Sequence, residues 1–367
     1  MTSFSTILLH WYDENKRELP WRQQSDPYTI WVSEIILQQT RVTQGYDYFL
    51  RFMERFPDVE ALARATEEEV MKMWQGLGYY SRARNLHAAA ISIVEAAGRE
   101  GRLVTFPSTY EEIRALKGVG DYTAAAICSF AYGLPHAVVD GNVYRVLSRY
   151  FGIDLPIDSP QGKKHFAALA AELLPARRSA DYNQAVMDFG ALQCTPQSPA
   201  CLLCPLQESC VALARGIVTQ LPVKHQRTAV LPRYFNYIYI GASGLSGSCE
   251  VLLHKRAAGD IWQGLYELPL VEADHDLTPE ELFASDGFQQ LVQGVEEPLK
   301  LRPLQCGVKH VLTHRIIYAN FYELLLSAET LNRCAGKPLA RFTRVKQEEV
   351  ENYAVPRLIH AFLEKYK

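Results

Sequence analysis

Four cysteines near the middle of the chain follow the spacing Cys-x6-Cys-x2-Cys-x5-Cys: Cys194, Cys201, Cys204 and Cys210. Such tight clustering is typical of a metal site rather than of a disulfide framework. Zinc usually binds two Cys-x2-Cys pairs, whereas only Cys201 and Cys204 form one here. A 4Fe–4S cluster needs four thiolates on a short turning loop, and prolines lie between these cysteines. We therefore favour one 4Fe–4S cluster with a structural or slow redox role.

A glycine-containing turn and a lone aspartate are further candidate sites. Gly118 and Gly120 lie in the turn Leu116-Lys117-Gly118-Val119-Gly120 between two predicted helices. Such a turn exposes backbone N–H groups that can hold a phosphate, although it can also be a simple corner between helices. Asp140 follows Gly120 by twenty residues and precedes Gly141. By itself, an aspartate at this position would be a helix cap or a turn residue.

The bulk composition limits the possible classes of protein. A chain of 367 residues with 48% hydrophobic and 22% charged residues predicts two or three ordinary globular domains. The net charge of −3 argues mildly against a nucleic acid partner, but a local cationic face can operate on a neutral protein. The N-terminus does not resemble a secretory signal, and no apolar run is long enough to span a bilayer. We expect a protein of the reducing cytoplasm that does not contact membranes.

The residue pattern changes near position 225, which separates a helical region from a mixed one. Apolar periodicity predicts the following helices: 2–16, 27–43, 66–74, 81–97, 109–115, 121–132, 142–150, 160–174 and 181–192. Aromatic and β-branched runs beyond that point predict strands at 234–243, 250–256, 265–271 and 315–326, with helices around 278–293 and 355–366. The polar, basic segment 221–233 is predicted to be a linker. The fold class is therefore all-α followed by α+β.

The cysteine spacing, the glycine turn and Asp140, in this order, resemble the endonuclease III superfamily of helix–hairpin–helix DNA glycosylases. The resemblance implies a six-helix barrel with an iron–sulfur subdomain over residues 1–220, a cluster loop at 194–210 and a catalytic Asp140. The superfamily's bifunctional lyases carry a lysine at the position of Tyr122. Tyrosine cannot form a Schiff base with the sugar, so a monofunctional hydrolase is indicated.

Motifs in the N-terminal third resemble the MutY family of adenine DNA glycosylases: Leu19-Pro20-Trp21-Arg22, Ser33-Glu34-Ile35-Ile36-Leu37-Gln38-Gln39-Thr40 and Gly76-Leu77-Gly78-Tyr79-Tyr80. Cleavage of an N-glycosidic bond builds positive charge on the sugar and negative charge on the leaving base, which two carboxyl groups can serve. Glu34 lies on an apolar helix, where a raised pKa would suit a general acid. The resemblance implies that Glu34 protonates adenine, that Asp140 stabilises the cationic sugar, and that Tyr122 and Asn142 orient them.

The resemblance also implies DNA contacts, because the base must leave the duplex before it is cut. Gln39, Leu77 and Tyr79 match residues that wedge into the stack or contact the opposing base, and Thr40 completes their motif. Trp21, Arg22 and Gln184 match the lining of the adenine pocket. Gly118 and Gly120 form the hairpin, and Arg82 is expected to meet phosphates. The alternatives are core packing for Leu77 and a solvated helix face for Arg82.

The segment 259–269 resembles the start of a Nudix fold, and we interpret residues 234–367 as a Nudix-like domain without the acidic helix that binds magnesium. In the MutY family this domain reads 8-oxoguanine opposite the adenine through a Phe-Ser-His-type loop. Here the matching residues are Leu312, Thr313 and His314. The hydroxyl and the imidazole remain available for hydrogen bonding, whereas Leu312 puts an aromatic stacking contact in doubt.

The sequence thus predicts a monomeric DNA glycosylase that hydrolyses adenine from double-stranded DNA when it is mispaired with 8-oxoguanine or guanine. The alternatives are an endonuclease III-like lyase that acts on oxidised pyrimidines, a non-catalytic lesion-binding protein, and an active nucleotide pyrophosphatase in the C-terminal domain.

Overall fold

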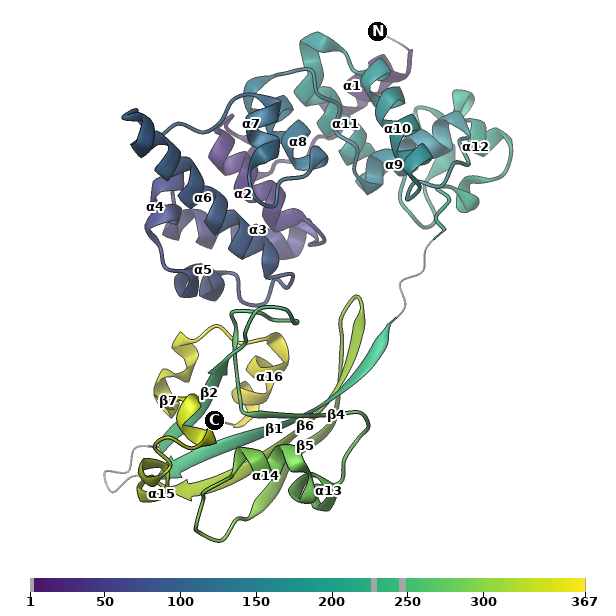
Figure 1. Ribbon diagram of the computed structural model, residues 1–367. Coiled ribbons are helices and arrows are strands. Elements are labelled where there is room, and N and C mark those ends of the chain that lie inside the picture. Colours follow the sequence, from purple (N-terminus) through teal and green to yellow (C-terminus); the bar gives the residue numbers. More distant parts are fainter. Residues whose placement is uncertain (1–2, 226–229, 244–248, 367) are drawn as a thin grey trace. The chain divides into compact units, whose positions relative to one another are not determined.

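The computed structural model describes residues 3–225, 230–243 and 249–366, and the chain forms two compact units. The first unit comprises residues 1–65 and 84–226, and the second comprises 66–83 and 227–367. The division differs from the predicted region 1–220 because the segment 66–83 belongs with the C-terminal part. Figure 1 shows the order of the elements along the chain.

The first unit is all-α, as the sequence predicted. Its main helices are α1 (Ser3–Asn15), α2 (Pro27–Leu37), α3 (Val42–Arg55), α4 (Val59–Arg64), α6 (Ser81–Glu100), α7 (Tyr110–Ala115), α8 (Asp121–Tyr132), α9 (Gly141–Phe151), α10 (Pro160–Leu173), α11 (Ser179–Leu192) and α12 (Val211–Ala214). The predicted helix 27–43 was wrong at its end, because α2 stops at Leu37 and Gln39 has a φ of +56°. The sequence did not predict α3, α4 or α12.

Local chemistry fixes the helix ends that matter for the site. At α2, Asp26 accepts a hydrogen bond from the backbone N–H of Thr29, and Pro27 follows as the first helical residue. Helix α8 ends at Gly133, with a φ of +65°, and α9 ends at Gly152, with a φ of +67°, because glycine adopts left-handed backbone without a Cβ clash. These caps set the positions from which the site residues project.

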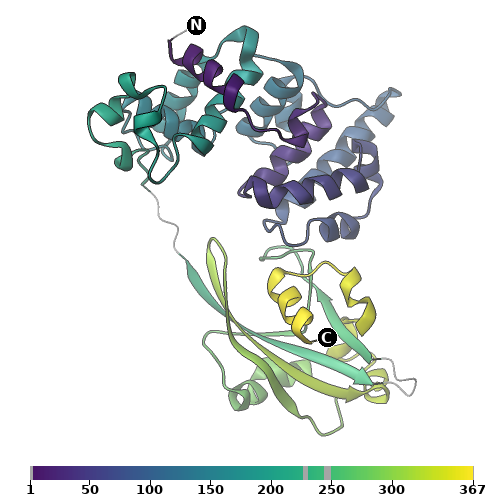
Figure 2. The same cartoon turned by 180° about the vertical axis from the view of Figure 1, so that it is seen from behind.

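A large apolar core joins α1, α9, α10 and α11 in the first unit. Phe4, Leu8, Phe166 and Phe189 are all buried there. The cysteine segment is anchored on the same core, because Leu206 is buried in it and Cys194 and Cys204 pack against it. Figure 2 shows this helical unit from behind. Within the described residues, no helix combines the length and the apolar character that crossing a membrane requires.

The second unit is α+β, as predicted, and contains a mixed sheet. The described strands are β1 (Leu231–Ser243), β2 (Cys249–Lys255), β3 (Tyr266–Glu267), β4 (Leu270–Ala273), β5 (Leu301–Val311), β6 (Arg315–Ser327) and β7 (Thr343–Lys346). Their order is β3-β2-β1-β6-β5, with β4 also paired to β1 and β7 to β2. The long central strands β1 and β6 run parallel, from the pair Leu231 and Arg315 to the pair Ser243 and Ser327.

Helices cover both faces of this sheet, as Figures 1 and 2 show. One face packs on α16 (Arg357–Tyr366) through residues such as Tyr237 and Phe362. The other packs on α13 (Pro279–Ala284), α14 (Asp286–Leu291) and α15 (Ala328–Arg333) through residues such as Ile240 and Phe288. The helix α5 (Glu67–Met73) is also part of this unit.

Several details differ from the predictions for this region. The predicted strand 265–271 is two strands with Pro269 between them, and the predicted helix 278–293 is two short helices that meet at Ser285, whose side chain caps the second. The sequence did not predict β5 or β7.

The predicted linker 221–233 was too long. Its first part is attached to the first unit, because Leu221 is buried and the N–H of Ile157 donates to the carbonyl of Val223. Its last part already belongs to β1. Residues 226–229 lie outside the described residues.

Candidate active site and metal centre

A cavity of about 1050 Å³ lies in the first unit, between α2 and α8 on one side and α1, α9 and α11 on the other. It brings together many of the residues singled out from the sequence: Trp21, Arg22, Glu34, Thr40, Tyr122, Asp140, Asn142 and Gln184. These residues come from segments that are far apart in the chain. Gln39 does not line the cavity; it is exposed beyond the end of α2.

Glu34 is a buried carboxyl group on α2 that faces this cavity. Its side chain lies among the apolar residues of the helix, and the residue is 7% exposed. Burial raises the pKa of Glu34 to about 7, with a further increase from the charge of Asp140, while the hydrogen bond from Tyr122 and the charge of Arg22 oppose the rise. Glu34 can therefore hold a proton near neutral pH and release it, as a general acid requires.

The glycine turn places Tyr122 against Glu34. Gly118 has a φ of +82°, and a Cβ atom there would lie 2.7 Å from the Cβ of Asn85, so both the backbone and the space favour glycine. Gly120 then caps α8, whose second residue is Tyr122. The Tyr122 hydroxyl donates a hydrogen bond of 2.7 Å to Oε2 of Glu34. Burial raises the pKa of Tyr122 well above its usual value, so the phenol remains a donor.

Asp140 caps the N-terminus of α9 and faces the same cavity. Its Oδ1 accepts hydrogen bonds of 2.8 Å from the backbone N–H groups of Asn142 and Val143, and its Oδ2 accepts one of 2.8 Å from the Asn142 side chain. Burial raises the pKa of Asp140, and these three donors oppose the rise. Because the donors favour a carboxylate, Asp140 is the better placed of the two acids to carry a negative charge.

A buried ion cluster beside the cavity was not predicted from the sequence. Asp188 on α11 is fully buried, and its oxygens accept hydrogen bonds of 2.7 and 2.9 Å from the guanidinium of Arg22. Arg17 pairs with the same carboxylate. Hydrogen bonds from the two arginines lower the pKa of Asp188 against the effect of burial. The hydroxyl of Tyr12 donates a hydrogen bond of 2.6 Å to Oε1 of Gln184. A charged residue one helical turn after Gln184 on an apolar face was the signal that could have revealed this cluster.

The four cysteines line one small cavity together with apolar side chains such as Val146, Phe189 and Leu206. Four thiols on a short loop are the ligand set that a 4Fe–4S cluster needs, and this cavity brings all four together.

Two buried arginines on α9 join the cysteine loop to the active site, and neither was predicted. Arg145 donates 2.8 Å to Oδ1 of Asn142 and 2.7 Å to the carbonyl of Cys194. Arg149 donates 3.4 Å to Sγ of Cys194 and 2.7 Å to the carbonyl of Thr195. The spacing of four residues, which places both arginines on one face of the helix, was the sequence signal that could have revealed them.

The residues 77, 79 and 82, which were expected to contact DNA, differ in exposure. Tyr79 is 43% exposed, whereas Leu77 is buried rather than at an exposed loop tip. Arg82 is also buried: its guanidinium donates 3.1 Å to the carbonyl of Gly78 and lies over the rings of Trp74 and Tyr79. Burial lowers the pKa of Arg82 to about 10. These contacts favour a structural role of Arg82 within this segment, and its contact with phosphates stays a prediction.

In the second unit, the turn between β5 and β6 carries the residues predicted to read the opposing base. Thr313 and His314 are exposed, whereas Leu312 is partly buried and packs on the core beneath α16. The hydroxyls of Tyr79 and Thr313 lie 2.5 Å apart. The turn can therefore offer a hydroxyl and an imidazole to a ligand, while Leu312 packs on the core and carries no aromatic ring for stacking.

Proteins of known activity resemble the chain over most of its length. An adenine DNA glycosylase from Mus musculus is 44% identical over 89% of this chain and 71% of its own. Another, from Buchnera aphidicola, is 30% identical over 86% of this chain and 84% of its own. The chain belongs to the adenine DNA glycosylases. Members of this family are DNA glycosylases, so the protein is an enzyme of base excision repair that acts on DNA.

Family models match three parts of this adenine DNA glycosylase family member. Residues 32–175 match the HhH-GPD superfamily of base excision DNA repair proteins, and 245–365 match the NUDIX domain. Residues 194–210, the segment that contains the four cysteines, match the iron–sulfur binding domain of endonuclease III, so the cofactor is a 4Fe–4S cluster.

Solved structures agree on the fold of the first unit. A thermostable thymine-DNA glycosylase superposes with a TM-score of 0.53 at 30% identity, over 58% of this chain and 95% of its own. An endonuclease III–DNA complex superposes with a TM-score of 0.50 at 20% identity, also over 58% of this chain and 95% of its own, which supports the fold alone. The predicted helix–hairpin–helix fold, followed by a Nudix-like domain, is thus confirmed.

Proposed function

We propose that the protein hydrolyses the N-glycosidic bond of adenine in double-stranded DNA where adenine is mispaired with 8-oxoguanine or guanine. The observation that carries this proposal is the pair of acids in one cavity, held in different environments. Glu34 is buried with a pKa raised to about 7, whereas Asp140 accepts three N–H hydrogen bonds. This division suits a reaction that needs one proton donor and one negative charge.

Glu34 supplies the proton in this proposal. The adenine leaves the duplex and enters the cavity, where Trp21, Arg22 and Gln184 contact it. Protonated Glu34 donates to N7 of the base, which makes adenine a neutral leaving group. The resulting carboxylate can take a proton from the attacking water, so Glu34 ends the reaction in its starting state. The hydroxyl of Tyr122 holds Oε2 in place throughout.

Asp140 stabilises the other product of bond cleavage, the cationic sugar. The backbone and side-chain donors of Asn142 and Val143 fix both carboxylate oxygens, so this charge is oriented before the substrate arrives. A preorganised charge stabilises a transition state more than a mobile one. Arg145 keeps Asn142 in position for this task.

The 4Fe–4S cluster, when bound, supplies iron–thiolate bonds that tie the segment 194–210 to the end of α11. Through Arg145 and Arg149, the protein links this segment to α9. We therefore assign the cluster a structural role, with the chemistry in the separate cavity.

Reading of the opposing base is assigned to the turn at Thr313 and His314. Both side chains are exposed, and a hydroxyl and an imidazole can bond to the edge of 8-oxoguanine. Tyr79 lies beside Thr313 and offers an exposed aromatic face for stacking. We further propose that the enzyme acts as a monomer in the reducing cytoplasm, which keeps the four thiols available for iron.

The test is adenine release under single-turnover conditions from a duplex with adenine opposite 8-oxoguanine, followed by borohydride treatment. We expect free adenine and no trapped covalent complex, because Tyr122 takes the place of the lyase lysine. The cavity lining includes Lys16, but an exposed amine lacks the burial that activates a Schiff-base lysine. Efficient trapping would support the lyase alternative, and binding without adenine release would support a non-catalytic protein.

A further inference from the structure

The loop between β2 and β3 holds a tryptophan in an unusual backbone conformation. Trp262 has a φ of +59°, between Gly259 at +98° and Gly264 at +81°. The left-handed conformation costs a residue with a Cβ atom about 1–2 kcal/mol, and glycine would avoid that cost. A bulky residue persists there only where its surroundings hold it, and such outliers point to a function for the side chain.

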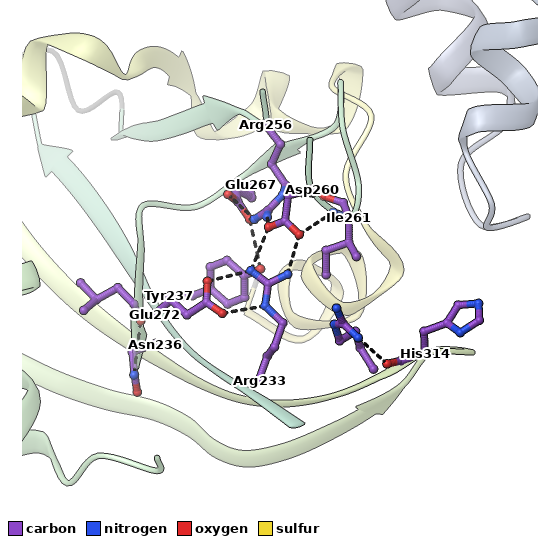
Figure 3. Close-up of polar contacts among 11 residues, drawn as sticks. Arg233, Asn236, Tyr237, Arg256, Asp260, Ile261, Glu267, Glu272 and His314 are labelled. Carbon is purple, nitrogen blue, oxygen red and sulfur yellow. Dashed lines mark hydrogen bonds and ion pairs between the residues drawn. The ribbon is translucent and has the colours of Figure 1, made fainter. Parts of the chain in front are cut away.

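An ion cluster holds this loop from one side, as Figure 3 shows. The guanidinium of Arg233 donates 2.6 and 2.8 Å to the two oxygens of Asp260, and 2.6 and 2.7 Å to those of Glu272. Arg256 pairs with the buried Glu267 at 2.7 and 2.8 Å, and also with Asp260. The hydrogen bond from Arg233 is the main cause that lowers the pKa of Asp260 to about 2, so Asp260 is ionised at neutral pH.

Backbone contacts hold the same loop from within. Nε of Arg256 donates 2.8 Å to the carbonyl of Ile261, and the N–H of Ile261 donates 2.7 Å to Oδ1 of Asp260. The N–H of Leu265 donates 3.0 Å to the carbonyl of Trp262. These contacts hold the backbone at Ile261 and Trp262, from which the indole projects.

The indole of Trp262 reaches the strand that leads into the β5–β6 turn. Its ring lies 5.9 Å from the ring of His310 and 6.3 Å from that of Phe235, measured between centroids. His310 precedes Leu312 by two residues, so both side chains project from the same face of the chain. Leu312 and Trp262 pack against the same core, and the N–H of Leu312 donates 2.8 Å to the carbonyl of Arg315 to close the turn.

We propose that Trp262, held by the cluster of Arg233, Arg256 and Asp260, is the positioning residue that sets the β5–β6 turn for reading the base opposite adenine. The inference rests on the proposed function of that turn. Thr313 and His314 are exposed at the end of this turn, so the directions of their hydrogen bonds depend on the position of the backbone that carries them. Figure 3 shows the imidazole of His314 directed away from the strands, while its carbonyl accepts hydrogen bonds from the Arg315 side chain and from the N–H of Leu231.

The test is the ratio of single-turnover adenine release opposite 8-oxoguanine to that opposite guanine, measured on the full chain with its cluster. We expect Trp262→Ala to lower this ratio about tenfold, because a well-oriented hydrogen bond contributes roughly that much discrimination. Trp262→Phe keeps a ring against His310 and should restore most of the ratio. Asp260→Asn removes the charge that anchors the loop and should lower the ratio in the same direction.

Phe283→Ala is the matched control, because Phe283 is an aromatic residue of the same unit that contacts Phe288 on the other face of the sheet. This variant should keep the wild-type ratio. An unchanged ratio in both Trp262→Ala and Asp260→Asn would overturn the proposal, as would an equal fall in Phe283→Ala. If Trp262→Ala does not fold, the ratios of Asp260→Asn and Trp262→Phe decide. The proposal then requires a lower ratio in Asp260→Asn than in Trp262→Phe. A wild-type enzyme without any preference for 8-oxoguanine would instead refute the proposed function of the turn.

Discussion

The cavity of the first unit and the β5–β6 turn of the second differ in the exposure of their functional side chains. Glu34 is buried and shares its cavity with Asp140. Hydrogen-bond donors orient both carboxyl groups, and burial raises the pKa of each. Thr313 and His314 are exposed, because they must reach a base that lies outside the protein. Cleavage of the glycosidic bond thus depends on the surroundings of the two carboxyl groups. Recognition of the opposing base depends on the residues that support the backbone of the turn.

The largest expected effect is on the cavity side. Asp140→Asn keeps the size of the side chain but removes the charge that stabilises the sugar cation. We expect single-turnover adenine release to fall by about 10³-fold. Duplex binding and iron content should remain near wild type, which serves as the control for folding. Release within tenfold of wild type would remove Asp140 from the mechanism.

The next effect concerns the proton on Glu34. Because the acid form is required, the rate of the chemical step should fall above a pH of about 7, by about tenfold for each further pH unit. The hydrogen bond from Tyr122 lowers the pKa of Glu34. The substitution Tyr122→Phe should therefore move the fall in rate to higher pH. The measurement is the pH at the midpoint rather than the rate itself. A midpoint that stays in place, or moves to lower pH, would contradict this assignment.

Removal of iron should lower the stability of the first unit and leave the stability of the second unchanged. The cysteine loop packs on the core of α1, α9, α10 and α11, whereas the second unit has cores of its own. We expect chelation to lower the melting temperature of the first unit by roughly 5 °C or more. Calorimetry of the full chain should show a second transition that is unaffected. Equal shifts of both transitions would show that the cluster stabilises the molecule as a whole.

The smallest expected effect is on the turn. Thr313→Ala and His314→Ala each remove one hydrogen-bonding group from an exposed position. We expect each to lower the preference for 8-oxoguanine over guanine by about threefold to tenfold. Lys309→Ala, on the same strand but before the turn, is the control. A preference that survives both substitutions would place lesion reading elsewhere.

The sequence predicted the residues of the cavity better than the residues that support them. Motif spacing identified Glu34, Tyr122 and Asp140, because chemistry restricts which residue types can occupy those positions. Asp188, Arg145 and Arg149 were missed, because a charged residue in a helical pattern usually lies on the solvated face. Only the fold shows that these helices turn such residues inward.

Local signals also decided which parts of the fold were predicted. Aromatic runs identified β1 and β6. The strand β7 and the helix α4 are too short to give a clear pattern, whereas α3 is amphipathic and its helical spacing of apolar residues was missed. The burial of Arg82 was not predicted for a related reason, because it depends on packing against Trp74 that local sequence does not reveal.

The most direct test compares single-turnover adenine release by the wild-type enzyme from three duplexes, with adenine opposite 8-oxoguanine, guanine or thymine. If the cavity cleaves the bond and the turn reads the opposing base, release should be fastest opposite 8-oxoguanine, slower opposite guanine and slowest opposite thymine. Equal rates for all three duplexes, or no release from any, would contradict it.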